Sequence, residues 1–188
     1  MIELAKGQEM ALTTADGTPL TRLRLGVGWD KERTAGFIGT GAPEVDLDAS
    51  VVEFAEGKLF DLAFYNNLAT RDGSVVHRGD NKTGRGEGDD EVIDIDLGRV
   101  YAKVDTLVFL VSSYQGHTLE WINHAYCRLV DDQDVELARF TLTGGVPQTG
   151  LAMAKLFRDG DGWRLRAIGE GIAVKVPTES VAALQRFL

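Results

Sequence analysis

Apolar and polar residues alternate with a period of two along most of the chain. This period is typical of β-strands that bury one face and expose the other, because successive side chains of a strand point to opposite faces. In one of these runs Asp46 and Asp48 fall on the polar, solvent-facing side, opposite Leu47 and Ala49. The clearest alternating runs span residues 23–29, 45–51, 60–65 and 93–97.

Several shorter runs predict further strands. The last two flank Asp159-Gly160-Asp161-Gly162, a composition typical of a tight β-hairpin in which glycine supplies the positive φ. Short strands separated by turns at regular intervals favour an all-β fold, namely an antiparallel β-sandwich of two sheets. A closed barrel is the alternative. These further strands are expected at residues 106–112, 119–129, 135–142, 151–157 and 163–168.

The pattern predicts one short helix, at the C-terminal end. Thr178 is a candidate N-cap, and we expect the helix to dock on the sandwich. No repeat or proline-rich linker interrupts the chain, and 44% of the residues are hydrophobic, enough for one core, so residues 1–188 are expected to form a single domain. The apolar stripe of the helix consists of Val181, Leu184, Phe187 and Leu188.

The charge balance restricts the possible partners. Twenty Lys and Arg against 29 Asp and Glu give a net charge of -9, which repels nucleic acid and anionic lipid and attracts cations. Cys127 is the only cysteine, so neither an internal disulfide nor a zinc cluster of cysteines is available. The chain start lacks the apolar segment of a signal peptide, and no run approaches about 18 apolar residues. We therefore expect a cytoplasmic protein that binds no nucleic acid directly.

Residues 79–91 differ from the rest of the chain. They hold five carboxylates, an asparagine and four glycines between two strand patterns. Like charges this close repel by roughly 1 kcal/mol per pair in water, and a hard divalent cation removes that cost. Calcium takes about six to eight oxygens from carboxylates, amides, backbone carbonyls and water, all of which this loop offers. Magnesium needs a stricter octahedron, and zinc or copper would need the His or Cys that the loop lacks.

The segment from Asp80 to Glu91 has the 12-residue length of an EF-hand loop but a different pattern. Lys82, Gly84 and Arg85 stand where that motif needs two ligands and a glycine, and the flanks resemble strands instead of helices. The residues therefore predict a calcium loop of another kind. A solvated hairpin is an equally good interpretation of the composition alone.

Two other segments are candidates to complete the coordination of one or two calcium ions. Asp46 and Asp48 share a strand face and lie roughly 7 Å apart. Asn66 and Asn67 end the strand pattern at residues 60–65, where an amide oxygen could reach the loop. Asp46 and Asp48 could equally be surface residues without a ligand, since an outward polar face is common on strands. We interpret His77, His117 and His124 as core or surface residues, and Asp131, Asp132 and Asp134 as a turn.

Several distinctive motifs follow one another in order along the chain. They are Gly28-Trp29-Asp30, Asp46-Leu47-Asp48-Ala49-Ser50, Phe64-Tyr65-Asn66-Asn67, Asp72-Gly73-Ser74-Val75-Val76-His77, the acidic loop, Glu136-Leu137-Ala138-Arg139-Phe140 and residues 163–171. In this order they resemble the TerD family of tellurium-resistance and general stress proteins. The residues after Gly171 depart from that family as a divergent helical tail.

The resemblance implies a cytoplasmic bacterial β-sandwich that binds calcium at the acidic loop, takes part in tellurite resistance and stress response, and has no catalytic activity. Gly84 and Gly86 would serve as carbonyl or conformational positions. The implied ligands are Asp46, Asp48, Asn66, Asp80, Asn81, Asp89, Asp90 and Glu91.

We therefore expect a non-enzymatic, calcium-dependent interaction module whose partners are other stress-response proteins, with membrane association left open. A metal-dependent phosphoesterase is one alternative, because clustered carboxylates can hold two catalytic ions, but no His or Lys partner stands out. A calcium-dependent membrane binder of the C2 kind is another, weakened by the lack of apolar or basic loop tips. Direct tellurite chemistry is disfavoured, since a lone cysteine offers no dithiol.

Overall fold

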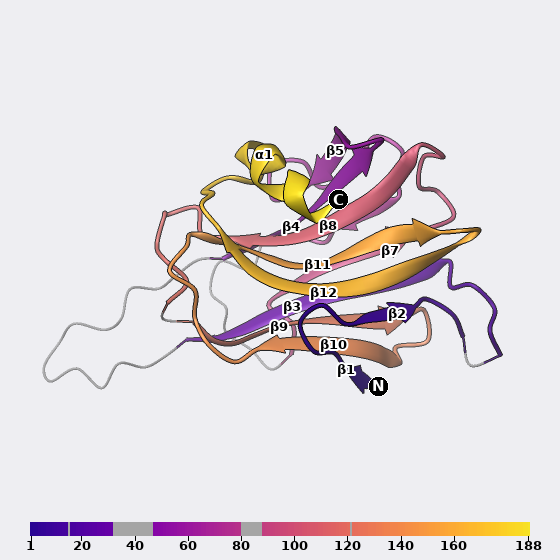
Figure 1. Cartoon of the computed structure of the whole chain (residues 1–188), viewed down its shortest axis with the longest axis horizontal. Helices are drawn as coiled ribbons and strands as arrows, with labels where there is room; N and C mark the ends of the chain where they lie inside the picture. The colour runs from indigo at the N-terminus through magenta and orange to yellow at the C-terminus, as the bar shows by residue number, and fades with distance from the viewer. Residues whose placement is uncertain (15, 32–46, 80–87, 121) are drawn as a thin grey trace, which may run out of the picture.

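Two six-stranded β-sheets pack face to face to form the body of the molecule (Figure 1). The structure, a computed structural model, describes residues 1–14, 16–31, 47–79, 88–120 and 122–188. The first sheet has the strand order β1 (Ile2–Glu3), β10 (Glu136–Leu142), β9 (Ile122–Asp131), β3 (Arg22–Lys31), β7 (Glu91–Asp96), β6 (Val75–His77). The second has the order β2 (Glu9–Ala11), β12 (Gly162–Ile172), β11 (Gly150–Asp159), β8 (Val104–Ser112), β4 (Asp48–Ala55), β5 (Lys58–Ala63).

The strand pairing confirms the predicted sandwich. Among the described strands only β1 and β10 run parallel, and the strands divide into two sheets instead of one closed barrel. The predicted hairpin joins β11 to β12, with Asp159 opposite Gly162 and Gly160 at a φ of 59°. The short strands β1, β2 and β6 were not anticipated, because two or three residues are too few to show a period.

The alternating pattern builds the core between the sheets. In β7 every second side chain is buried, and Ile93 and Ile95 lie opposite Leu25 and Leu23 of β3. These residues belong to the same apolar cluster as Phe109 of β8, in the other sheet. Each such side chain stabilises the fold by about 1.5 to 3 kcal/mol when it leaves water. The inner faces of the two sheets therefore hold the sandwich together.

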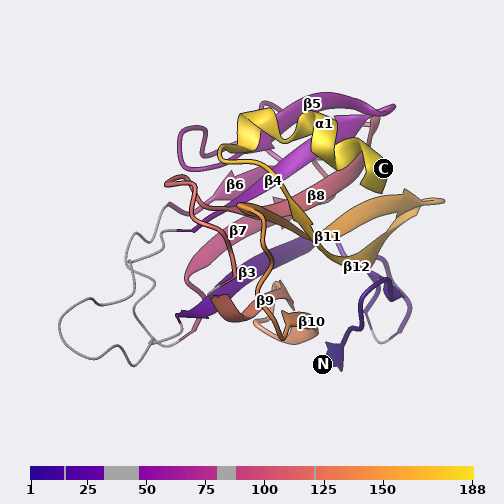
Figure 2. The same ribbon diagram turned by 60° about the vertical axis from the view of Figure 1, so that its left-hand side comes forward.

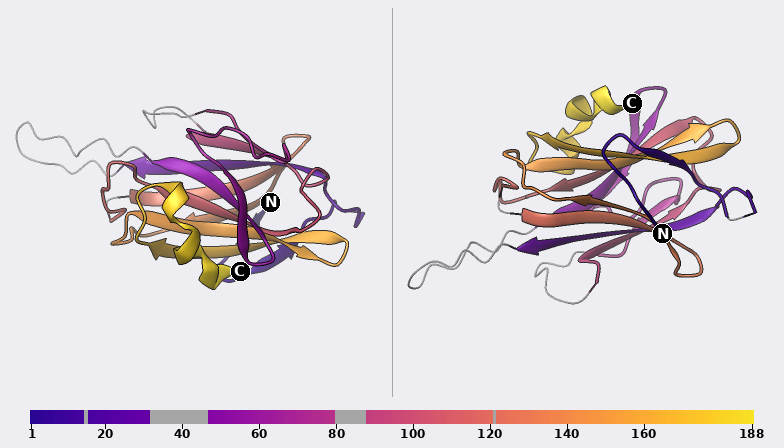
Figure 3. Two further views of the ribbon diagram at one scale, coloured as in Figure 1. Left: turned by 90° about the horizontal axis from the view of Figure 1, so that it is seen from above. Right: turned by 60° about the horizontal axis from the view of Figure 1, so that its bottom comes forward.

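The second sheet is buried on its outer face as well. Strands β4 and β8 are buried along nearly their whole length, and Phe54 and Leu110 form a second apolar cluster with Leu184 of the C-terminal tail. The tail lies across this face (Figure 2; Figure 3, left). The expected solvent-facing side of β4 is therefore wrong for Asp48 and Ser50, which are 4% and 0% exposed.

The tail is a chain of short turns and not one continuous helix. It consists of a 3-10 turn at Pro177–Glu179, the four-residue helix α1 (Val181–Leu184) and a second 3-10 turn at Gln185–Phe187. Thr178 lies in the first turn, and Ser180 is at the N-cap position of α1, so the predicted cap is wrong. The predicted docking is confirmed. Across the described ranges, no helix has the length and apolar character needed to cross a membrane.

Strand β4 carries a buried glutamate that bonds to a residue of the segment before β6. Glu53 of β4 is fully buried, and its Oε1 accepts a 2.6 Å hydrogen bond from the Ser74 hydroxyl. Its Oε2 is buried without a hydrogen-bond partner among the described residues. Burial raises the pKa of Glu53 to about 7 against the opposing effect of the Ser74 bond, and the nearby Asp72 and Asp61 raise it further. The folded protein therefore holds a proton on Glu53 that the unfolded chain releases near pH 4.5.

This proton makes stability fall as the pH rises. Between pH 4.5 and about 7 the unfolded state loses the proton first, so the free energy of unfolding should drop by about 2 to 3 kcal/mol across that window. The uncharged variant Glu53→Gln should lack this drop. Urea denaturation at pH 5 and pH 8 measures it, with Glu120→Gln, at an exposed position, as the control. Parallel pH dependence in the parent and in Glu53→Gln would show that Glu53 does not carry the effect.

Candidate functional site

The acidic loop connects β6 to β7, two neighbouring strands of the first sheet. Residues 80–87 lie outside the described part of the chain, which resumes at Gly88 and continues into β7. Gly79 and Gly88, at the two ends of that segment, have φ values of 110° and 107°. A side chain would be strained at either φ, so glycine is needed where the chain turns into and out of the loop.

Glu91, the last acid of the loop, connects the two sheets. It is the first residue of β7, and its Oε2 accepts a 2.5 Å hydrogen bond from the Ala49 backbone N–H of β4. The ladder between β4 and β5 ends at Val51 and Ala63, so Ala49 lies beyond its last pair. Because a buried backbone N–H needs a partner, Glu91 supplies the acceptor that β5 no longer offers.

His77 completes this junction from β6. Its Nδ1 accepts a 3.0 Å hydrogen bond from the Gly79 N–H, so the ring proton is on Nε2. Nε2 donates to the Ala49 carbonyl oxygen at 3.1 Å and lies 3.3 Å from Glu91 Oε2. Both backbone groups of Ala49 are thus held by residues that flank the acidic loop. His77 is a buried structural residue, as one of its two sequence interpretations stated.

Asp89 takes part in a salt bridge. Arg128 of β9 donates to its two carboxylate oxygens, from Nε at 2.7 Å and from Nη2 at 2.9 Å. The Tyr126 hydroxyl lies 3.1 Å from Asp89 Oδ1, and burial together with Asp89 raises the pKa of Tyr126 to about 12. A side chain at Gly26 would overlap the Asp89 carboxylate, so this glycine of β3 makes room for the pair.

The remaining described candidates occupy different surroundings. Asp90 Oδ2 accepts a 3.0 Å hydrogen bond from the Trp29 N–H, which fixes the loop to β3. Asp48 is buried at the start of β4, next to Ala49 in the chain. Asn66 is exposed in the tight turn that follows β5. The structure therefore places Glu91 at the junction with Ala49, Asp90 against β3, Asp48 at the start of β4 and Asn66 in a surface turn.

The predicted ligand set is described only in part. Within the described ranges, no group of three or more His, Cys, Asp or Glu is arranged to hold a metal ion. The described candidates offer only oxygen donors, which suits calcium better than zinc. Asp46, Asp80, Asn81, Gly84 and Gly86 lie outside the described residues, so the complete set stays a prediction.

Tyr126 and Arg128 were missed as partners of the loop. They stand two residues apart on β9, on the face opposite Cys127, and from sequence they are indistinguishable from ordinary surface residues. In the sequence, only Gly26 and Gly28 of β3 indicate that other residues pack closely against this strand. Added side chains there would meet Asp89 and Tyr126, so glycines within a strand marked a close approach.

The chain is similar to proteins of resistance and stress response. The family model for the TerD domain matches residues 1–178, which includes the start of the tail. The chain is 38% identical to the tellurium resistance protein TerZ of Serratia marcescens, over 90% of this chain and 89% of that protein. It is also 38% identical to the stress response protein SCP2 of Bacillus subtilis (strain 168), over 90% and 92% of the two chains. Neither name refers to a catalysed reaction.

A solved structure shares the fold. It is that of a homologue of the telluride resistance protein TerD from Streptomyces coelicolor, with a TM-score of 0.66 over 86% of this chain and 95% of the other. The two sequences are 19% identical, so this likeness concerns the fold alone.

The junction at Ala49 should contribute measurably to stability. In Glu91→Met, a side chain of similar length replaces the carboxylate but offers no strong acceptor, so the Ala49 N–H loses the Oε2 atom to which it donates. A buried group left without its partner costs about 1 to 3 kcal/mol. Chemical denaturation in the presence of a chelator measures this loss apart from any metal effect.

Asp94→Asn is the matched control, because Asp94 lies on the same strand with its side chain 41% exposed. It should change the free energy of unfolding by less than about 0.5 kcal/mol. Equal stability of Glu91→Met and Asp94→Asn would contradict the role given to Glu91.

Proposed function

Since the chain belongs to the TerD family of tellurium resistance and stress response proteins, we propose that it acts in that response by binding calcium. The proposed site lies at the end of the sandwich where residues 79–91 join β6 to β7. The protein serves there as an interaction module and catalyses no reaction.

The observation that carries this proposal is the hydrogen bond between Glu91 and Ala49. It joins two residues 42 positions apart and brings the end of the acidic loop beside the segment that contains Asp46 and Asp48. Carboxylates from both segments can therefore contribute to one cation. Gathered carboxylates repel one another in the absence of a cation, so the arrangement favours binding one.

Calcium is the cation that best matches the donors. Carboxylates, an amide side chain and the carbonyls of a glycine-rich loop supply hard oxygens in a flexible arrangement, which calcium accepts and magnesium does not favour. The proposed donors are Asp46, Asp48, Asp80, Asn81, Asp90 and Glu91, with Asn66 from the turn after β5 and the backbone carbonyls of Gly84 and Gly86.

Asp89 is better suited to hold the loop than to bind the ion. Both of its oxygens already accept charge-assisted hydrogen bonds from Arg128. A direct calcium ligand would lose part of that bidentate pair, and the nearby guanidinium would repel the ion. We therefore assign Asp89 to positioning the end of the loop, next to Asp90.

Calcium binding would order the loop and so create a surface that a partner recognises. The loop enters through Gly79, beside His77, and leaves through Asp90 and Glu91, so its ends are held by both sheets. A rigid frame of this kind limits the entropy lost when the ion binds. The proposed partners are other stress-response proteins in the cytoplasm.

The hydrolase alternative gains no support from the histidine nearest to the acids. Both ring nitrogens of His77 already make hydrogen bonds, to Gly79 and to Ala49, and the ring is buried. It is therefore poorly placed to activate a water molecule or to protonate a leaving group.

Thermal unfolding with and without calcium tests the proposal. At a hundredfold excess over Kd, a ligand of the native state adds about 2.7 kcal/mol, which for a chain of this size raises Tm by roughly 5 to 10 °C. Magnesium should raise Tm less. The double variant Asp80→Asn/Asp90→Asn should lose most of the calcium shift, and calorimetry should show a matching loss of binding heat.

The control Asp132→Asn/Asp161→Asn removes two charges from exposed turns and should keep the full shift. A calcium shift of the same size in the site variant and in this control would refute the site. The absence of binding heat in the parent at millimolar calcium would refute calcium binding altogether.

A further inference from the structure

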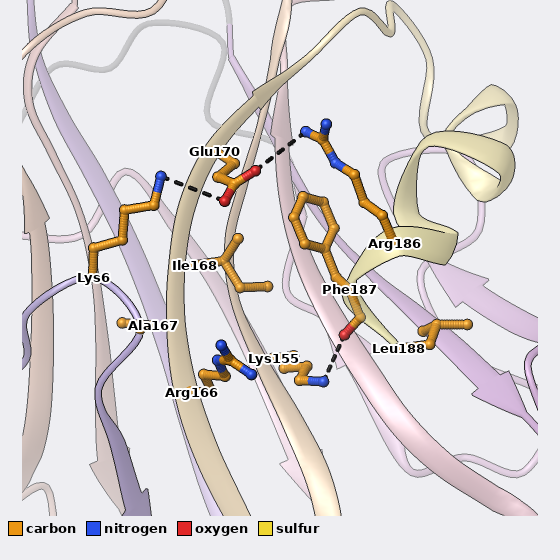
Figure 4. Close-up of a pocket in the computed structure, with 10 residues that line it drawn as sticks. Lys6, Lys155, Arg166, Ala167, Ile168, Glu170, Arg186, Phe187 and Leu188 are labelled. Carbon is orange, nitrogen blue, oxygen red and sulfur yellow. Dashed lines mark hydrogen bonds and ion pairs between the residues drawn. The ribbon is translucent and has the colours of Figure 1, made fainter.

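A cavity of about 280 Å³ lies on the outer face of the second sheet, whereas β6 and β7, the strands on either side of the acidic loop, belong to the first. Its floor is formed by β11 and β12, one side by the turn at Lys6 and Gly7, and the other side by the end of the C-terminal tail (Figure 4). Small-molecule sites usually measure about 300 to 1,000 Å³, so this cavity lies just below that range and has room only for a small ligand.

The cavity is positively charged although the chain carries a net charge of -9. Lys6, Lys155, Arg166 and Arg186 line it, and Glu170 is its one acidic side chain. These cations come from separate parts of the chain, so their convergence is a property of the fold.

Two of these cations face each other directly across the sheet. Lys155 of β11 is the register partner of Arg166 of β12, and like charges directly opposite on neighbouring strands destabilise a sheet. The Lys155 side chain is also largely buried, and burial together with Arg166 lowers its pKa. Its Nζ donates a 2.5 Å hydrogen bond to the Phe187 carbonyl, which carries no compensating charge.

The neighbouring carboxylates compensate these charges only in part. Glu170 is shared between Lys6 and Arg186, which approach it from opposite sides at 3.5 Å each (Figure 4). Arg166 lies 3.8 Å from Glu9, at the long end of an ion pair. The Lys155 and Arg166 side of the cavity therefore retains an excess of positive charge.

We propose that this cavity binds a multiply charged oxyanion, namely a phosphate group, either free or carried by a small metabolite. A phosphate between Lys155 and Arg166 would remove their mutual repulsion, and the planar guanidinium of Arg166 can bind two of its oxygens. Ile168 and Phe187 provide an apolar wall for the organic part of a phosphate ester. Arg186 and Phe187 lie beyond residue 178, where the match to the TerD domain ends, so part of the site belongs to the tail of this chain.

Isothermal titration calorimetry of the full chain with inorganic phosphate, and separately with glucose 6-phosphate, tests the proposal. Ionic strength is held constant with sodium chloride. We expect saturable binding at one site, weakened about tenfold or more in Arg166→Gln/Arg186→Gln, since each substitution removes a charged donor. Equal affinity for both ligands would indicate free phosphate, and tighter binding of the ester would indicate a phosphorylated metabolite.

Two further variants make the test specific. Arg22→Gln/Arg164→Gln removes the same charge outside the cavity and should bind like the parent. Glu170→Gln removes the competing carboxylate and should bind phosphate several-fold more tightly, a gain that loss of structure cannot imitate. The proposal is overturned if neither ligand gives saturable heat, or if the cavity double variant and its control bind equally well.

Discussion

The carboxylate of Glu91 is the interaction on which the acidic end of the molecule depends. It lies in the interior between the sheets, where a charge needs hydrogen-bond donors close by. The Ala49 N–H donates to it at 2.5 Å, and His77 Nε2, which donates to the Ala49 carbonyl oxygen, lies 3.3 Å from it. The same contacts satisfy backbone groups of β4 that lie beyond the last pair of β5. One carboxylate thus links β7 of the first sheet to β4 of the second, at the end of the acidic loop.

A second constraint comes from the burial of the second sheet on both faces. Phe54 and Leu110 would expose a large apolar area without the tail, and Leu184 covers them. The tail therefore has a structural task as well as a place in the cationic cavity, because the turn after α1 carries Arg186 and Phe187 to the rim. The two proposed sites are separate: the calcium site is proposed at the junction of β4 and β7, and the phosphate site where the tail lies on β11 and β12.

The sequence predicted the fold where burial follows a local period. Strand β7 alternates along its whole length, because one face meets the core and the other is partly exposed. It failed for the outer face of β4, since Val52 and Phe54 on that face pack in one cluster with Leu184, more than a hundred positions away. It also missed the Arg128 partner of Asp89, which no local pattern distinguishes from a surface arginine. The acidic loop was recognisable by its composition. The bond from Glu91 to Ala49 was not, because it depends on where β5 stops pairing with β4.

In this account, calcium bound at the acidic loop stabilises the junction between the sheets. Hydrogen exchange of the Ala49 amide, followed by NMR with and without calcium, tests it most directly. If opening of the junction requires loss of the ion, calcium at a hundredfold excess over Kd should slow this exchange by up to about a hundredfold. An Ala49 exchange rate unchanged by calcium, under conditions where calorimetry shows the ion to be bound, would contradict the account.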